Sequence, residues 1–309
     1  MSDEAGEAGE ILWLLGQPSL EDYLDFVRGR VVGGDRIART TIIEDWRAAN
    51  DRFHDLRVTE AGAADGHEPA PLDPDMAPLA ESLRADPLFI EACSSFPGEI
   101  MMAQLDRLVV YQPHIAVDYA ERRAILLRQQ KDAAAIFRHC LPRERSQPPV
   151  RIQRLARDRY LFTSPSTDLR PHASTLLNAA QAAGVDSSGP IAGIIGLIVG
   201  YGTNFLSGIA FNGRLLLHNG YHRAYSLRAA GITHAPMLVR SVSSVEELCV
   251  AAVERVADDV GHYFASPRPP MLKDYFDGAL AKRHAAYPSR TAVEVEFKMR
   301  RVTAGVRSG

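Results

Sequence analysis

Cysteine is scarce in this chain, and its placement excludes two common ways of stabilising a small fold. Three cysteines occur in 309 residues, at Cys93, Cys140 and Cys249, with no close spacing between them. Neither a disulfide framework nor a cysteine-based zinc site is therefore expected. The first residues are acidic and lack the positive start of a secretory signal, so the sequence predicts a cytoplasmic protein.

Lysine is absent from the first 95 residues, and charge is divided unevenly along the chain. Residues 1–95 hold 20 acidic residues against 8 arginines, a balance of −12, and the remainder holds 27 basic against 18 acidic residues, a balance of +9. Regions of opposite sign attract each other, and a positive region attracts phosphates. The acidic region is either a surface that docks a protein partner or a solvated helical face, and both interpretations stay open.

Charge is missing altogether from residues 189–211, a run of 23 residues that is long enough to cross a bilayer. Only its first part is strongly apolar, because Thr203, Asn204 and Ser207 interrupt the second part. A segment buried in the protein core is therefore favoured over a membrane span, and no membrane association is expected.

The apolar pattern predicts an α+β protein with an N-terminal helical region. Residues 1–95 form an acidic, mainly helical region, residues 96–245 form the mixed-sheet domain, and residues 246–309 add helices and a strand that pack on it. The elements expected within these regions include a strand over 105–111, a helix over 118–139, an alanine-rich helix over 174–183, and a hairpin turn at Asn212-Gly213.

The most informative motif is an apolar run that ends in Asn219-Gly220 and continues at once as a helical pattern. Gly220 can take a positive φ and lets another group approach the backbone closely. The first amides of a helix have no partner within it, and with the helix dipole they form an anion site. The same dipole disfavours a cation in the first turn, so Arg223 at this place indicates an anionic ligand.

Residues 219–225, Asn-Gly-Tyr-His-Arg-Ala-Tyr, with Leu227, Gly231 and the strand-like 235–239, resemble the G-x-H-R / G-E-R-R box of the ParB/sulfiredoxin-like superfamily. A weaker resemblance at 103–112 looks like the opening strand of that family. In the superfamily the box binds nucleotide phosphates. The resemblance implies a bacterial protein with a ParB-like mixed sheet. It also implies phosphate binding by Asn219, Gly220, Tyr221, His222 and Arg223, with Asp106, Gln112 and His218 around them.

Two departures limit what the resemblance carries. Tyr221 stands where sulfiredoxins have a cysteine just before the His-Arg pair, so reduction of sulfinic acids is not expected. Partition proteins follow the nucleotide domain with a helix-turn-helix domain, and the residues after Val239 do not show that pattern. A complete partition protein is therefore not expected either.

His218 and His222 have the spacing of a metal-binding pair on a helix, but Asn219-Gly220 breaks any helix between them. No carboxylate lies nearby in the sequence to complete a ligand set, so no metal site is expected.

Two classes of function fit these residues. In the first, the chain is a nucleotide-dependent hydrolase or phosphotransferase: the amides of residues 221–223 hold the phosphates, His222 and Arg223 neutralise charge, and Asp106 or Glu99 acts as base or holds Mg²⁺. In the second, the same residues form a non-catalytic nucleotide sensor or a nucleic-acid contact. The sequence does not identify the ligand, so a nucleotide with Mg²⁺ remains an expectation.

Overall fold

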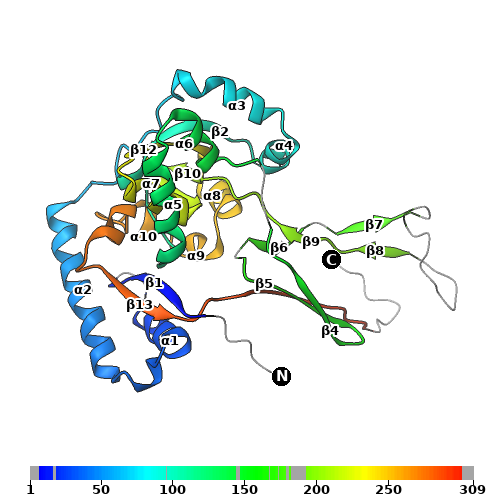
Figure 1. The fold of residues 1–309 in the computed structure, drawn as a ribbon, viewed down its shortest axis with the longest axis horizontal. Helices are drawn as coiled ribbons and strands as arrows, with labels where there is room; N and C mark the ends of the chain where they lie inside the picture. Colours follow the sequence, from blue (N-terminus) through cyan, green and yellow to red (C-terminus); the bar gives the residue numbers. More distant parts are fainter. Residues whose placement is uncertain are drawn as a thin grey trace. The chain divides into compact units, whose positions relative to one another are not determined.

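The computed structural model describes residues 7–16, 19–94, 96–143, 147–166, 168–172, 174–178, 181 and 193–300. It is 40% helical and 27% strand, which confirms the α+β class (Figure 1). The chain divides into two compact units, Met1–Arg145 with Asn204–Pro288 and Ser146–Thr203 with Ser289–Gly309. These bounds differ from the three regions expected from the sequence, since residues 96–245 contribute to both units.

The first unit contains helices and strands from both parts of its chain. In chain order they are β1 (Gly9–Leu14), α1 (Leu20–Arg30), η1 (Gly34–Arg36), α2 (Arg39–Thr59), η2 (Pro74–Met76), α3 (Ala77–Arg84), α4 (Pro87–Ser94), β2 (Glu99–Gln104), η3 (Leu105–Arg107), β3 (His114–Ala116), α5 (Val117–Gln129), α6 (Ala133–Cys140), β10 (Ser207–Phe211), β11 (Arg214–Asn219), α7 (Tyr221–Ala229), β12 (His234–Ser241), α8 (Val245–Ala251), α9 (Glu254–Ala257), α10 (Val260–Phe264), η4 (Leu272–Phe276) and β13 (Ala281–Ala286).

A four-stranded sheet in the order β11-β10-β12-β2 forms the centre of the first unit. β10 and β11 are antiparallel, and β10 and β12 are parallel. The turn between β10 and β11 confirms the predicted hairpin: Asn212 has φ 50° and Gly213 has φ 69°. Two positive φ values give a turn whose twist matches that of the flanking strands. A second sheet, in the order β13-β1-β3, joins the start of the described chain to its later part.

Two predicted elements of the first unit are wrong in their bounds. The strand expected over 105–111 lies earlier, at β2, and the chain then forms the short 3-10 helix η3. The single helix expected over 118–139 is two helices, α5 and α6, because a new helix starts after Asp132. The Asp132 carboxylate accepts a hydrogen bond from the Ala135 N–H at 2.8 Å, which stabilises that start.

Five acidic residues of the early region form ion pairs with basic residues of residues 204–288. Six ion pairs connect the two: Glu10 with Arg283, Asp22 with Arg255, Asp45 with Lys282, Asp65 with Arg214, and Glu60 with Arg268 and Lys273. The attraction expected from the uneven charge distribution is thus satisfied within the first unit.

The second unit is built from short strands: β4 (Arg151–Ala156), β5 (Arg159–Ser164), β6 (Leu169–Pro171), β7 (Thr175–Leu177), β8 (Ile194–Gly196), β9 (Val199–Tyr201) and β14 (Thr291–Glu296). They form three sheets, β14-β5-β4, β6-β9 and β7-β8. The helix expected over 174–183 is wrong, because residues 175–177 pair with β8; residues 179, 180, 182 and 183 lie outside the described residues. Pairing with a distant strand overrides the local helix propensity.

The charge-free run at 189–211 is only partly buried, and residues 189–192 lie outside the described residues. Its later part follows the prediction, since Phe205, Leu206 and Ile209 are buried. Its earlier part does not: Ile195 in β8 is 67% exposed, and Ile198, between β8 and β9, is 52% exposed. No described helix has the length and apolar character needed to cross a membrane.

A buried ion pair lies where α2 meets η4. The Arg268 side chain is 1% exposed and that of Asp274 is 2% exposed. Arg268 donates to Asp274 at 2.5 and 2.6 Å and to Glu60 at 3.0 Å, and its guanidinium lies 5.1 Å from the centroid of the Phe53 ring. Carboxylates on two different elements thus compensate one buried cation.

Replacing Arg268 by Met should reduce the free energy of unfolding by about 3–5 kcal/mol, because Asp274 would remain buried without its cation. Arg255→Met is the matched control, since Arg255 and Asp22 are 44% and 41% exposed, and it should cost less than about 1 kcal/mol. Urea unfolding of both variants measures the difference. Equal losses would contradict a special role for the buried pair.

Candidate functional site

The predicted strand–loop–helix is confirmed around Gly220. β11 ends at Asn219 and α7 begins at Tyr221, with Gly220 between them at φ 93° and ψ 29°, in the left-handed region. The Gly220 N–H donates to the Asn219 side-chain oxygen at 2.8 Å, and the Gly220 carbonyl accepts from the Ala224 N–H at 2.9 Å. The local sequence therefore determines where the helix starts.

Glycine at position 220 is required by a neighbour inside the fold. A Cβ there would lie 2.9 Å from Leu206 Cδ1 and 3.0 Å from Leu206 Cα. The sequence led us to expect that the close approach is made by a ligand; the structure places the Leu206 backbone there. Positive φ and this contact each disfavour a side chain.

Tyr221 lies inside the first unit, where its hydroxyl joins two segments. The hydroxyl accepts from the Tyr111 N–H at 3.1 Å and donates to the Leu217 carbonyl at 2.7 Å. Burial raises the pKa of Tyr221 well above its usual value. The Tyr111 hydroxyl in turn donates to the His218 carbonyl at 2.8 Å, so residues 217–221 are tied to the segment at 111.

His222 is a neutral hydrogen-bond acceptor in this structure. Its Nε2 accepts from the Ala116 N–H at 3.0 Å, and its ring makes an edge contact with Tyr119 at 5.7 Å between centroids. Burial, followed by the nearby charges of Arg223 and Arg123, lowers its pKa to about 4. At neutral pH the imidazole therefore brings no positive charge to the start of α7.

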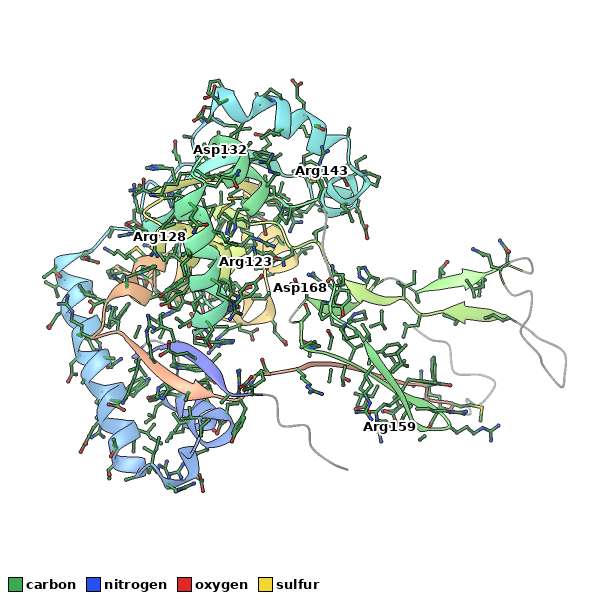
Figure 2. The ribbon with its side chains drawn as sticks, viewed as in Figure 1. Arg123, Arg128, Asp132, Arg143, Arg159 and Asp168 are labelled. Carbon is green, nitrogen blue, oxygen red and sulfur yellow. The ribbon has the colours of Figure 1, made fainter. Side chains whose placement is uncertain are left out.

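The positive charge near this site comes from two arginines on different helices. Arg223 is 6% exposed and donates through Nη1 to the main-chain and side-chain oxygens of Asn204. Arg123 lies on α5, with its guanidinium 4.6 Å from the centroid of the Tyr119 ring (Figure 2). In the described part of the chain no carboxylate forms an ion pair with Arg123.

Burial and the same two guanidiniums lower the pKa of a second histidine, His139. His139 on α6 lies 3.0 Å from the Ser226 hydroxyl, and its pKa falls to about 3 through burial and then through the charges of Arg123 and Arg223. Both arginines therefore lie within electrostatic range of both imidazoles. We name Arg123, His139, His222 and Arg223 the arginine–histidine cluster. The sequence motif indicated His222 and Arg223. Arg123 and His139 lie about 80 or more residues away along the chain, and no sequence pattern connected them with the motif.

The residues expected around the box are only partly near it. Asp106 pairs with Arg228 Nε at 2.5 Å, at the C-terminal end of α7, whereas the box is at the N-terminal end. Gln112 donates to the His114 carbonyl at 2.7 Å. Glu99 is exposed at the start of β2. Neither carboxylate proposed as a base is therefore placed at the start of α7.

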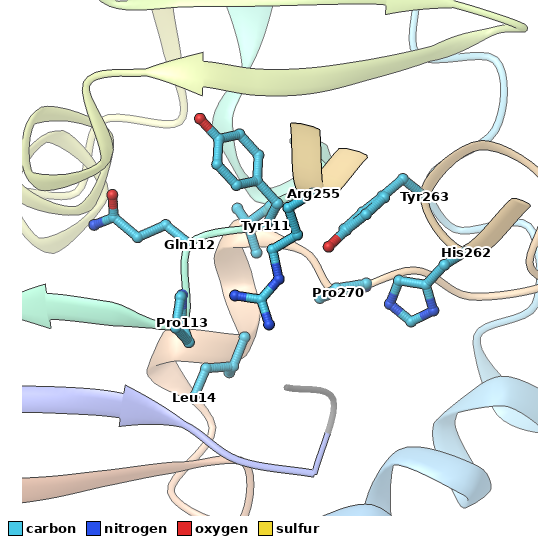
Figure 3. Close-up of a pocket in the computed structure, with 9 residues that line it drawn as sticks. Leu14, Tyr111, Gln112, Pro113, Arg255, His262, Tyr263 and Pro270 are labelled. Atoms are coloured by element: carbon cyan, nitrogen blue, oxygen red, sulfur yellow. The ribbon is translucent and has the colours of Figure 1, made fainter. Parts of the chain in front are cut away.

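A small cavity of about 30 Å³ lies beside the segment that Tyr221 holds. Figure 3 shows the Arg255 guanidinium among its lining residues, which include Leu14, Tyr111, Gln112 and Tyr263. The volume is about that of one water molecule. Arg255 and Tyr263 follow the box by more than 30 residues, and no motif drew attention to them.

Among the residues that the structure describes, no three histidine, cysteine, aspartate or glutamate side chains form a group that could hold a metal ion. Comparison of the chain with protein-family models, with curated proteins and with solved structures found no match. The site is therefore interpreted from its own geometry.

Replacing Gly220 by Ala should destabilise the fold, because a Cβ would meet Leu206 and the backbone φ would be strained. Gly33→Ala is the matched control: Gly33 has φ 70° with nothing within 4 Å of its added Cβ. Strain alone costs about 1–2 kcal/mol, and overpacking should add about 1–3 kcal/mol at Gly220. Thermal and urea unfolding compare the two; equal costs would show that Leu206 gives way.

The free energy of unfolding should fall as pH drops from about 6.5 toward 4. His222 and His139 have a folded pKa of about 4 and about 3, and an unfolded histidine has about 6.5. Their neutral forms are favoured in the fold, so the stability that they contribute is present above the unfolded pKa and is lost below it.

His139→Gln should make this acid-dependent loss shallower, since Gln cannot take up the proton. His54→Gln on α2 is the matched control for the substitution, because His54 is exposed. Urea unfolding at several pH values measures each slope. A His139→Gln curve parallel to that of the wild type would contradict the interpretation.

Proposed function

We propose that this chain binds a phosphate-bearing ligand of the nucleotide class at the start of α7. The observation that carries the proposal is that Arg123 and Arg223 both act on His222 and His139 near this helix start, where the pKa of these histidines falls to about 4 and about 3. The resemblance of residues 219–225 to the phosphate-binding box of the ParB/sulfiredoxin-like superfamily supports the same interpretation.

Electrostatics favours an anion at this place. The guanidiniums of Arg123 and Arg223 both lie near His222, and the positive end of the α7 dipole adds positive potential at the helix start. A phosphate would interact favourably with all three. The planar guanidinium also presents pairs of N–H donors that match phosphate oxygens.

The contact between Arg223 and Asn204 indicates how the ligand would be accommodated. Two neutral oxygens of Asn204 accept from Arg223 Nη1. A charged phosphate oxygen forms a stronger bond with a guanidinium than a neutral carbonyl does. Binding would therefore exchange these acceptors for phosphate oxygens, with a shift of Asn204.

Tyr119 supplies a surface for the rest of a nucleotide. It is 41% exposed, and its ring contacts both His222 and the Arg123 guanidinium. An exposed aromatic ring beside a phosphate site is suited to stacking with a base.

We propose binding, and we assign no catalytic step. Asp106 is held by Arg228, and Glu99 is on another element, so neither supports the alternative of a hydrolase or phosphotransferase. A magnesium ion would reach this site with the nucleotide, through its phosphates.

A thermal-shift screen with inorganic phosphate and with nucleoside mono-, di- and triphosphates, with and without Mg²⁺, should identify the ligand class, since a bound ligand raises the melting temperature. Calorimetric titration then measures affinity. Arg123→Ala should weaken binding by about 1.5–3 kcal/mol, the contribution of a hydrogen bond to a charged group. Arg122→Ala is the matched control, because Arg122 is its exposed neighbour on α5.

Arg223→Lys should bind more tightly than Arg223→Ala and less tightly than the wild type, because lysine keeps the charge and loses the planar donor pair. Melting temperatures of the unliganded variants separate a loss of affinity from a loss of stability. Unchanged affinity in both Arg123→Ala and Arg223→Ala, or no shift with any phosphate compound, would contradict the proposal.

A further inference from the structure

The three-stranded sheet β14-β5-β4 of the second unit has two chemically different faces. Residues directly opposite each other in the sheet share a face. The register pairs Ile152 with Phe162, and Arg154 with Tyr160, and β14 adds Val293 and Val295 opposite the same two aromatic residues. Phe297 follows β14 and makes an edge contact with Tyr160 at 6.5 Å. We name these seven residues the aromatic face: Ile152, Arg154, Tyr160, Phe162, Val293, Val295 and Phe297.

The opposite face carries the acids of the sheet, and they are paired. Arg159 (Figure 2) forms an ion pair with Glu294, and Lys298 pairs with Glu296 at 3.1 Å. Alternation along β14 places both glutamates away from the aromatic face. The aromatic face therefore holds no carboxylate, and its one charged group is Arg154.

Nothing within the described second unit forms a core over the aromatic face. Ser164 is the one buried residue of the three strands. Ile152 is 62% exposed and Phe297 54% exposed. Tyr160 and Phe162 on β5 are partly buried, so their rings remain partly accessible. A contiguous accessible apolar surface of this kind indicates an interaction site.

The charge of the second unit specifies the kind of partner. Residues 146–203 and 289–309 contain 10 basic and 5 acidic residues, a balance of +5, although the whole chain carries −3. On the aromatic face the Arg154 guanidinium lies 5.8 Å from the centroid of the Tyr160 ring. Positive charge combined with accessible rings and a ring-stacked arginine is the composition that binds single-stranded nucleic acids.

We propose that the aromatic face binds single-stranded nucleic acid. The bases stack on Tyr160, Phe162 and Phe297, and Arg154 contacts the phosphates. We expect duplex nucleic acid to bind this face more weakly, because its bases are paired and stacked on one another and cannot stack on the aromatic rings. The site is separate from the arginine–histidine cluster, since its residues belong to the other unit.

Fluorescence anisotropy with labelled oligonucleotides of about 12 nucleotides, poly-dT and poly-rU, tests the proposal on the full chain at low salt. Arg154→Ala and Phe297→Ala should each weaken binding about tenfold, within the range for loss of one stacked base. Phe297→Leu separates stacking from apolar contact, because it keeps an apolar side chain without a ring, and it should lose nearly as much affinity. The affinity of the wild type should fall as salt rises.

Arg151→Ala is the matched control, since Arg151 is an exposed arginine on the same strand and alternation places it on the opposite face. It should change affinity by less than about threefold, the size of one non-specific phosphate contact. All four variants should keep the wild-type affinity for phosphate compounds, so a failure here is distinguishable from failure at the start of α7.

Four results would overturn the proposal. They are no binding of single strands at low salt, equal binding of duplexes, equal losses for Arg151→Ala and Arg154→Ala, and self-association that Phe297→Ala abolishes without any nucleic-acid binding. Sedimentation of the wild type and of Phe297→Ala measures the last of these. The unfolding transitions of the variants should match that of the wild type, which excludes loss of folding as the cause.

Discussion

The buried guanidinium of Arg268 is the interaction on which the arrangement of the first unit depends. It is compensated by Asp274 of η4 and Glu60 at the end of α2, so it joins two elements that are far apart in the sequence. The residues that follow Arg268 form main-chain hydrogen bonds with residues 108–110. The Pro270 carbonyl accepts from the Val110 N–H at 2.9 Å, and the Leu272 N–H donates to the Leu108 carbonyl at 2.9 Å. That segment continues to Tyr111, whose N–H reaches the Tyr221 hydroxyl. One buried ion pair therefore helps to position the start of α7.

Residues 219–225 make hydrogen bonds and packing contacts within the fold, and these contacts limit which of their groups could bind a ligand. Gly220 accommodates Leu206, the Tyr221 hydroxyl ties two segments, and the neutral His222 accepts from a main-chain amide. Chemistry toward an anion then rests on the arginines, which stay charged under all ordinary conditions. A low pKa at His222 and His139 is a consequence of the same arrangement, because burial and two nearby cations both disfavour protonation.

The two units differ in how their charges are paired and in how much apolar surface they bury. In the first, acids of the early region meet bases from residues 204–288, and three clusters of buried apolar side chains form the core. In the second, short strands carry a positive balance and leave large apolar side chains accessible, among them Ile152, Ile195 and Phe297. A partner that buried such a sheet face would stabilise this unit, because the apolar side chains would lose their contact with water. This difference places the two proposed binding functions on different parts of the chain.

The sequence by itself determined the features that depend on a few neighbouring residues. The hairpin at Asn212-Gly213 and the helix start at Gly220 were predictable because positive φ is costly for most residues and Asn and Gly tolerate it. Only the tertiary structure decided the strand at 175–177 and the partners of the candidate site. Asp106 pairs with Arg228, and Arg123 and Arg223 both lie near His222, across about a hundred residues or more. Contacts of that kind depend on how distant segments pack, and local spacing in a single sequence carries no record of such distances.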